Sequence, residues 1–348
     1  MGKVIIPNGA VGEDAVYKEQ AIREYSGNPF IEALPPIYAP DEVVEKLAVY
    51  PYYSEEERNL DAHYRIHLTQ KLFKCFQPLP LHLDLESRIS RVIRQGYLMR
   101  NPINREYVMS LRDGYKAIHS YDINFSQEFR SQACGFTIIG VSGMGKSVSI
   151  NRVLSLYPQI IVHSKYNGQG FSFYQLVWLK VDCPFDGSVK GLCIDFFYKV
   201  DQLTGTDFYK KVANSKKPVD YMLTLMCQVV RNTGLGLLII DEVQHLCGAR
   251  GFGDERMLNF FVTLVNAVGV PIILIGTPKA MSILQSEFRQ ARRGSGQGDM
   301  VWERLQYDGN FEILLDSLWQ YQWTRKESIL TKSMQESLYE ESQGIIDI

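Results

Sequence analysis

A glycine-rich segment near the middle of the chain constrains the fold more than any other feature. Residues 140–147 read GVSGMGKS, which fits the pattern GxxxxGK[ST]. The apolar string FTII at 136–139 precedes it, and a stretch with helical periodicity follows from Lys146. In this strand–loop–helix order, backbone N–H groups curl around phosphates and the helix N-terminus adds a favourable dipole. The segment therefore predicts a nucleotide site within an α/β fold, and its setting weighs against a chance glycine-rich turn.

The motif gives each of its residues an expected role. Lys146 is expected to reach the β- and γ-phosphates of ATP, and Ser147 to ligate Mg²⁺. The turn that surrounds the phosphates is formed by Gly140, Ser142, Gly143, Met144 and Gly145.

A second motif, LLIIDE at 237–242, supplies acidic groups. Four apolar residues carry Asp241 to the carboxyl edge of a sheet, where ligands bind in such folds. We expect Asp241 to hold Mg²⁺ through water and Glu242 to polarise the attacking water; a purely structural carboxylate pair is the alternative. An acid at this place is typical of P-loop proteins that insert a strand between the two Walker strands, and IILI at 272–275 fits that inserted position. Thr277 at its tip is then a γ-phosphate sensor, a water-orienting group or a simple strand-end cap.

Phosphoryl transfer also needs positive charge on the γ-phosphate side. The segment FRQARRG at 288–294 ends a predicted helix. We expect Arg292 or Arg293 to act in trans on a neighbouring subunit's nucleotide; a solvated or DNA-facing basic helix end is the alternative.

Strands and helices alternate from residue 133 to 293, which indicates a parallel sheet covered on both faces. The expected helices are 146–157, 188–203 capped by Ser188, 220–232 capped by Asp220, 255–268 and 279–291. The expected strands are 136–139, 160–163, 174–181, 237–240 and 272–275. Three domains are expected: an N-terminal, partner-contacting extension over 1–80, a nucleotide-binding core over 81–310, and the start of a helical lid over 311–348. Arg88, Arg91 and Arg94 recur on one face of an expected helix, which indicates a charged face opposite an apolar one.

Composition excludes several classes of protein. The 348 residues are 45% hydrophobic with a net charge of −2, so a disordered chain and a small basic DNA-binding module are both disfavoured. No apolar run approaches the roughly 18 residues of a membrane span. The six cysteines lack zinc-ligand spacing, which indicates reduced thiols in a cytoplasmic protein.

Several longer strings together resemble TnsC, the AAA+ regulator of transposons that also encode TnsA, TnsB and a TniQ/TnsD target selector. They are LLIIDEVQHL, MLNFFVTLVNAVGVPIILIGTPKA, FRQARRGSGQG, ISRVIRQGYLMRNP and the N-terminal NPFIEALPP at 28–36. The resemblance runs from about residue 20 to the end.

The resemblance implies an AAA+ P-loop ATPase that binds ATP and Mg²⁺. It also implies rings or spirals of six or seven subunits around double-stranded DNA. Such an assembly links the TniQ/TnsD selector, in some systems placed by a CRISPR effector, to the TnsA/TnsB transposase. Hydrolysis would then drive disassembly. The family continues past the position of residue 348, so we expect the lid to be truncated here, together with its sensor arginine.

The resemblance also implies DNA contacts at Lys190 and Thr206, because related proteins place a lysine and a threonine at such positions. Lys210 and Lys211 join them, since residues 190–217 hold six lysines against three aspartates. Repeated around a ring, this local charge would make a positive pore that contacts phosphates without reading sequence. An ordinary solvated lysine-rich loop is the alternative.

Two other functions stay open. One is a nucleotide-gated DNA-binding scaffold with little or no hydrolysis, which Glu242 and a trans arginine argue against. The other is a defence-type signalling ATPase, which would need a receptor or effector domain, and no repeat array is found. The acidic segment 41–62 and NPFIEALPP are candidate partner contacts, although packing on the protein's own core explains them equally well.

Overall fold

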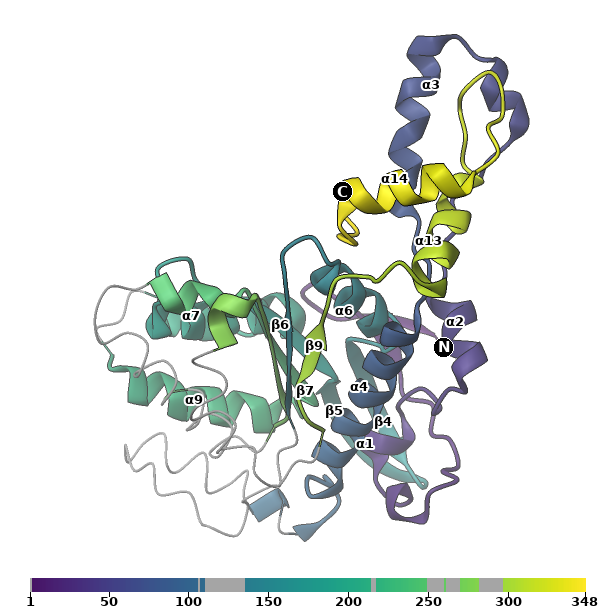
Figure 1. Ribbon diagram of the computed structural model, residues 1–348. Helices are drawn as coiled ribbons and strands as arrows, with labels where there is room; N and C mark the ends of the chain where they lie inside the picture. Colours follow the sequence, from purple (N-terminus) through teal and green to yellow (C-terminus); the bar gives the residue numbers. More distant parts are fainter. Residues whose placement is uncertain are drawn as a thin grey trace. The chain divides into compact units, whose positions relative to one another are not determined.

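The computed structural model describes residues 2–105, 107–109, 135–213, 217–248, 260, 270–281 and 297–348. Two compact units divide the chain (Figure 1). Unit 1 comprises Met1–Pro36, Arg88–Ile139 and Tyr157–Val301. Unit 2 comprises Ile37–Ser87, Gly140–Leu156 and Trp302–Ile348.

A five-stranded sheet forms the centre of unit 1, in the order β6-β7-β8-β3-β9. Its strands are β3 (Phe136–Gly140), β6 (Trp178–Asp182), β7 (Leu237–Asp241), β8 (Ile272–Gly276) and β9 (Met300–Trp302). The pairs β6–β7, β7–β8 and β3–β8 are parallel. Strands β3, β7 and β8 are buried throughout, as expected for parallel strands covered on both faces. The predicted parallel sheet is confirmed, and β8 lies between β3 and β7 as the acidic motif indicated.

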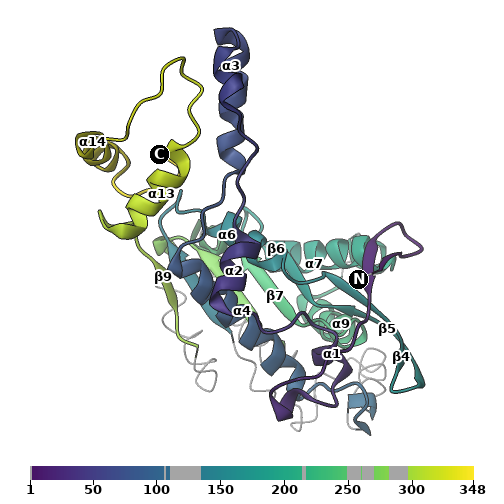
Figure 2. The same ribbon diagram turned by 90° about the vertical axis from the view of Figure 1, so that its right-hand side faces the viewer.

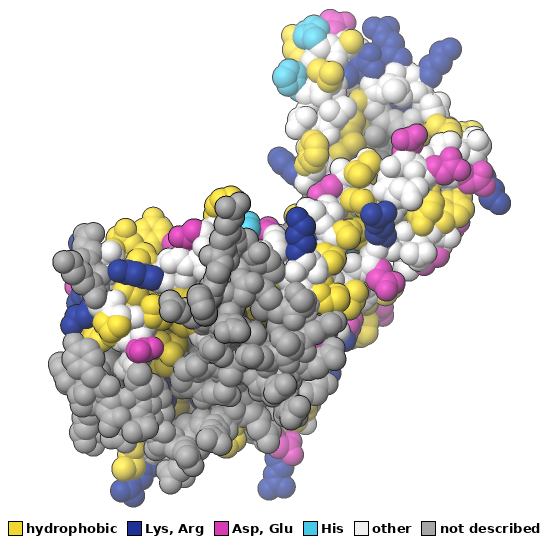
Figure 3. Space-filling view, turned by 60° about the vertical axis from the view of Figure 1, so that its left-hand side comes forward, with side chains coloured by type: hydrophobic (Ala, Val, Ile, Leu, Met, Phe, Trp, Pro, Cys, Tyr) yellow, Lys and Arg dark blue, Asp and Glu magenta, His cyan; other side chains and the backbone are white. Residues whose placement is uncertain are grey.

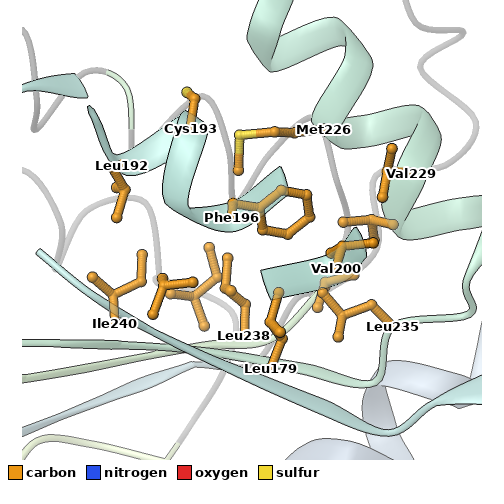
Figure 4. Close-up of a cluster of buried hydrophobic side chains, with 14 of the residues drawn as sticks. Leu179, Leu192, Cys193, Phe196, Val200, Met226, Val229, Leu235, Leu238 and Ile240 are labelled. Atoms are coloured by element: carbon orange, nitrogen blue, oxygen red, sulfur yellow. The ribbon is translucent and has the colours of Figure 1, made fainter. Parts of the chain in front are cut away.

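Two helices cover one face of this sheet (Figures 1 and 2): α7 (Val189–Thr204) and α9 (Val219–Asn232). Figure 4 shows Phe196 and Val200 of α7 between Met226 and Val229 of α9 and the sheet residues Leu179, Leu238 and Ile240. Each fully buried side chain of this size contributes about 1.5–3 kcal/mol to folding. This core fixes β6 and β7 beside each other.

The helix starts were only partly foreseen. Ser188 does cap α7, since its side chain accepts from the Gly191 N–H at 3.1 Å. Asp220 does not cap α9, which begins at Val219 after Pro218. Proline fixes φ and suits a helix entry, so the backbone here turns into the helix one residue before Asp220. Of the expected helices, 255–268 and most of 279–291 lie outside the described residues.

A second sheet has the order β1-β2-β4-β5. Its strands are β1 (Lys3–Ile5), β2 (Val11–Asp14), β4 (Ile160–Tyr166) and β5 (Gln169–Leu176). The expected strand 174–181 is therefore wrong, because β5 ends at Leu176 and β6 of the other sheet starts at Trp178. The string YQLVWLKV holds no Gly, Pro, Asn or Asp that would mark such a change of sheet.

The string NPFIEALPP packs on the protein's own core. Short helix α1 (Pro29–Glu32) lies within it, and Phe30, Ile31 and Leu34 are fully buried. The Asn28 side chain donates to the Tyr97 carbonyl at 2.8 Å, and the Gln175 amide donates to the Phe30 carbonyl at 2.9 Å. A run this apolar is explained by burial.

Helix α4 (Pro80–Leu98) corrects the expectation of one fully charged face. Arg91 is exposed, but Arg94 is only 1% exposed and donates to the Pro35 carbonyl at 2.5 Å and to Ser90 Oγ at 2.6 Å. The Arg88 guanidinium lies over the Phe136 ring, 5.9 Å from its centroid. Two of the three arginines thus attach this helix to the rest of unit 1.

Unit 2 joins N-terminal and C-terminal segments. Its longer helices are α2 (Pro40–Leu47), α6 (Lys146–Leu154), α13 (Gly309–Trp319) and α14 (Lys332–Ser342), and its shorter ones are η2 (Glu55–Asn59), α3 (Ala62–Leu68) and η3 (Thr69–Lys74). Arg65 of α3 donates to the Trp323 carbonyl at 2.5 Å, and Trp323 Nε1 donates to Glu57 Oε2 at 2.9 Å. The acidic segment 41–62 therefore packs partly against residues near the C-terminal helices.

Apolar side chains also reach the surface of unit 2 (Figure 3). Ile66 of α3 is 68% exposed, and Phe73 of η3 is 85% exposed. A cavity of about 720 Å³ lies between α3, η3, α13 and the residues that follow α13, with mostly apolar walls.

Four short helices complete the described elements: η1 (Arg23–Tyr25), α8 (Phe208–Val212), η5 (Val243–Gly248) and η6 (Pro278–Ala280). Cys75, Cys183, Cys193 and Cys227 form no disulfide among the described residues. Within the described ranges, no helix has both the length and the apolar character needed to cross a bilayer.

Candidate nucleotide site

The phosphate-loop segment has the backbone that its glycines permit. Gly143 has φ +82° and Gly145 has φ +69°, a region that L-residues with side chains seldom adopt. Gly145 stands directly before α6, whose first residue is Lys146. Gly140 leaves no room for a side chain, because a Cβ there would lie 2.6 Å from the Trp302 carbonyl oxygen. The loop conformation thus depends on the same glycines that the motif specifies.

The functional side chains of the loop lie as follows. Lys146 Nζ donates to the carbonyls of Gly140 at 2.8 Å and Val141 at 2.7 Å, so the ammonium group lies back over its own loop. Ser147 is in the first turn of α6 and partly exposed, and Ser142 is exposed. Met144 is buried, with 1% of its surface exposed. The Asp347 N–H donates to the Gly143 carbonyl at 3.1 Å, so a C-terminal segment of unit 2 contacts this loop.

Asp241 ends β7 in unit 1 and is held from two sides. Its Oδ1 accepts from the Glu242 N–H at 2.8 Å, and its Oδ2 lies 2.8 Å from Lys180 Nζ of β6. The Asp241 side chain is 5% exposed and the Lys180 side chain is 17% exposed. Strand register explains the pair: Lys180 is opposite Ile239, and side chains two residues apart share a face, so Lys180 and Asp241 project to the same side. The ammonium group compensates a carboxylate that burial would otherwise penalise.

Glu242 follows with an unusual backbone. Its φ is +58°, an uncommon value for a residue with a side chain, of a kind that clusters at functional sites. The turn is held by the His245 N–H, which donates to the Glu242 carbonyl at 3.0 Å. The Gln244 side-chain amide donates to Glu242 Oε2. His245 itself is tied to the Cys183 carbonyl through Nδ1 at 3.1 Å, which is a structural contact.

Thr277 lies at the carboxyl end of β8, just before η6. Its N–H donates to Gln244 Oε1 at 3.2 Å. Its side chain makes no cap hydrogen bond to η6, and the buried Oγ1 has no hydrogen-bond partner among the described residues. An unsatisfied buried hydroxyl is costly, so this one is a ready position for a ligand or water.

The strand order brings three strand ends of unit 1 to one edge. Strands β3, β8 and β7 are parallel neighbours, so their carboxyl ends share one edge of the sheet. The phosphate loop follows β3 directly, Thr277 follows β8, and Asp241 and Glu242 end β7. Arg292 and Arg293 lie outside the described residues.

The expected DNA-contacting residues cluster around α7 and α8. Lys190 is the second residue of α7 and is partly buried. The Thr206 hydroxyl donates to Asp201 Oδ1 at 2.5 Å, and Lys211 pairs with Asp207 at 2.6 Å. Lys210 is exposed. Asp207 therefore offsets the charge of Lys211, and the Thr206 hydroxyl is already bonded to Asp201.

Lys180 and Gln244 were missed by sequence reasoning. Lys180 is the one cation in the strand WLKVD, and that break in apolar character was the available signal. Gln244 belongs to the string EVQHL, but only the fold brings its amide between Glu242 and Thr277.

The residues fit a magnesium–nucleotide ligand. The glycine backbone of the loop would receive the phosphates. A Cβ at Gly143 would lie 2.9 Å from Ile345 Cγ2, so this glycine also allows the close approach of the C-terminal segment. Ser147 in unit 2 offers a hydroxyl oxygen and Asp241 in unit 1 offers carboxylate oxygens, which are the kind of ligand that Mg²⁺ prefers. In unit 1 the hydroxyl of Thr277 lacks a partner among the described residues. Among the described residues, no separate cluster of His, Cys, Asp and Glu could hold a metal ion.

Comparison with known proteins gave a family match and similarities to solved structures. Residues 130–284 match the AAA domain family. A Walker-type ATPase of Pyrococcus abyssi is similar in structure, with 15% identity and a TM-score of 0.42 over 70% of this chain and 64% of that one. The Orc1 protein of Aeropyrum pernix, solved in complex with DNA, has 12% identity and a TM-score of 0.35 over 61% of this chain and 48% of that one.

The chain thus spans less than two thirds of either protein. No curated protein matches the sequence significantly. With the strand order, the phosphate loop and the family match together, residues 130–284 carry an AAA P-loop ATPase fold.

Proposed function

We propose that this chain binds ATP with Mg²⁺ and hydrolyses it. The observation that carries the proposal is the set of groups at the carboxyl ends of three adjacent parallel strands: the glycine loop after β3, Thr277 after β8, and the Asp241–Glu242 pair at β7. In this scheme Lys146 leaves the carbonyls of its loop for the β- and γ-phosphates, and Glu242 accepts a proton from the attacking water. When bound, Mg²⁺ supplies positive charge that offsets the phosphate oxygens.

We further propose that ATP drives assembly of the chain around double-stranded DNA. The resemblance to TnsC supports this, together with the lysines of α7 and α8, of which Lys210 is exposed. The proposed contacts are Lys190, Thr206, Lys210 and Lys211 on backbone phosphates. Arg292 or Arg293 is proposed to complete a neighbour's site, and six or seven subunits to form a ring or spiral.

The role in transposition rests on the resemblance alone. In the proposal, the assembly links a TniQ/TnsD-type selector to a TnsA/TnsB transposase, and hydrolysis takes it apart. The exposed acids Glu55 and Glu56 of the segment 41–62 are better placed for a partner than NPFIEALPP, whose apolar residues are buried.

Electron microscopy of the protein with duplex DNA tests the assembly. Three conditions are compared: a non-hydrolysable ATP analogue, ADP and no nucleotide. Rings or spirals threaded by DNA only with the analogue would support a γ-phosphate-gated clamp. Monomers in all three conditions would refute the clamp for this chain. Assembly with ATP but no measurable phosphate release would favour the scaffold alternative.

A further inference from the structure

We propose that Gln244 is a positioning residue that holds the Glu242 carboxylate toward the end of β8 for water activation. The inference rests on the proposed ATP hydrolysis and names a residue that this reaction would depend on. Gln244 lies in η5, two residues beyond Glu242, and its side chain bonds to Glu242 and to the Thr277 backbone. Its action would therefore be indirect, through Glu242 and Thr277.

The Gln244 amide bridges two strand ends. Its Nε2 donates to Glu242 Oε2, and its Oε1 accepts from the Thr277 N–H at 3.2 Å. Glu242 follows β7 and Thr277 follows β8, which are adjacent parallel strands. One side chain thus connects the proposed general base with the backbone of the proposed γ-phosphate sensor.

The chemistry of the two partners fixes the orientation of this amide. An ionised carboxylate can only accept hydrogen bonds, and a backbone N–H can only donate. The NH₂ group must therefore face Glu242 and the carbonyl must face Thr277, because the flipped amide would lose both bonds. Gln is well suited here, since a carboxylate would repel Glu242 and an ammonium could not accept from Thr277.

The surrounding backbone makes room for the bridge. Gly276 precedes Thr277, and a Cβ at that position would come within 3.3 Å of Gln244 Oε1. That distance is tighter than most real contacts, so a larger residue would push the amide away. The positive φ of Glu242 turns the chain directly into η5 and brings Gln244 back over the end of β8. The small residue at Gly276 and the turn at Glu242 together allow Gln244 to approach the end of β8 closely.

This bridge would act on turnover more than on binding. The hydrogen bond engages Glu242 Oε2 and limits the directions the carboxylate can take. A positioned general base contributes about 10²–10⁴-fold to a rate, and part of that depends on fixed geometry. Nucleotide affinity depends chiefly on the phosphate loop, so it should be little affected.

The test compares steady-state ATP turnover and nucleotide affinity in matched variants of the full chain. Gln244→Met keeps the length of the side chain and removes both hydrogen bonds. Gln244→Glu keeps an acceptor for the Thr277 N–H but places a second carboxylate against Glu242. Gln169→Met is the control, because Gln169 is exposed on the β4–β5 hairpin. Affinity is measured with a fluorescent ATP analogue, and unfolding by urea reports on folding.

We expect kcat to fall by about 10–100-fold in Gln244→Met, with KM and analogue affinity within about threefold of wild type. Gln244→Glu should be at least as impaired, although it preserves the contact to Thr277. If Gln244→Glu retains wild-type kcat, Gln244 only supports the β8 backbone and the inference is wrong. If either variant loses both nucleotide affinity and kcat, the role of Gln244 is structural and the positioning inference is wrong.

Wild-type protein separates this inference from the proposed function. Absence of phosphate release by wild type with DNA and Mg²⁺ would refute the proposed hydrolysis, and the role of Gln244 with it. Robust wild-type turnover that Gln244→Met leaves unchanged would refute the role of Gln244 alone.

Discussion

Replacing Lys180 by Met should destabilise unit 1 through the buried charge left on Asp241. Lys180 Nζ lies 2.8 Å from Asp241 Oδ2, and Asp241 is 5% exposed. At an effective dielectric constant of about 20, two unit charges at this separation attract by about 6 kcal/mol. Most of that is offset by the cost of taking both groups out of water.

The net loss comes from the uncompensated carboxylate. Removing one partner of a buried pair costs about 3–5 kcal/mol, and the 17% exposure of Lys180 places this pair at the lower end. We therefore expect about 3 kcal/mol. For a urea slope of about 3 kcal/mol per molar, the unfolding midpoint should fall by about 1 M.

A double-mutant cycle followed by circular dichroism in urea measures this directly. Lys180→Met/Asp241→Asn should recover at least half of the loss, because no charge then remains buried. Asp182→Asn is the matched control: Asp182 also lies in β6, but its pair with Lys199 of α7 is 3.2 Å long and 59% exposed on the aspartate side. Exposed pairs contribute about 0–1 kcal/mol. A loss in Lys180→Met no larger than in the control would refute the reasoning.

Three further predictions follow from burial and charge. Burial lowers the pKa of His163 to about 4, so the unfolded chain binds this proton from about pH 6.5 downward while the folded chain resists it. The free energy of unfolding should therefore drop by up to roughly 3 kcal/mol as the pH falls from about 6.5 to 4. If the urea midpoint of His163→Phe falls with pH as much as that of wild type, His163 is not the cause. Phe30→Ala should cost about 3–5 kcal/mol in urea unfolding, because Phe30 is fully buried among other aromatic rings; a loss below about 1 kcal/mol would show that NPFIEALPP does not anchor the fold. Lys190→Ala should weaken DNA binding in fluorescence anisotropy and reduce the slope of log K against log salt by about 1, whereas an unchanged slope would remove Lys190 from the proposed interface.

The central fold could be predicted because its signals are local. The phosphate loop, the apolar string before it and the acids at 241–242 occur within short windows, and parallel strands make their carboxyl ends coincide. The position of β8 between β3 and β7 followed from the acid at Glu242 and is confirmed by the sheet order.

What failed depended on contacts between distant segments. The string 174–181 is uniformly compatible with one strand, yet Val177 separates two strands of different sheets. Arg94 shares its helical face with Arg91 by periodicity, but the Pro35 carbonyl draws it into the interior. Polarity patterns cannot reveal a partner that lies about 60 residues away in the chain.

Some residues of the candidate site could be predicted from a local motif, and others only from contacts between distant segments. Gly143, Lys146 and Asp241 were predicted as site residues from the motif chemistry alone. Lys180 and Gln244 became visible only through strand register and the turn at Glu242, since each acts on a residue of another segment. The roles expected for the predicted site residues, Thr277, Arg292 and Arg293 included, stay predictions.

Phosphate release by wild type and Glu242→Gln, measured beside nucleotide affinity, tests the central claim most directly. We predict that wild type releases phosphate in the presence of Mg²⁺ and DNA. Glu242→Gln should bind the ATP analogue as tightly as wild type while its turnover falls by at least about 100-fold, because the amide cannot accept the proton of water. Equal turnover in the two proteins would contradict the assignment of Glu242, and no turnover in either would contradict the proposed ATPase.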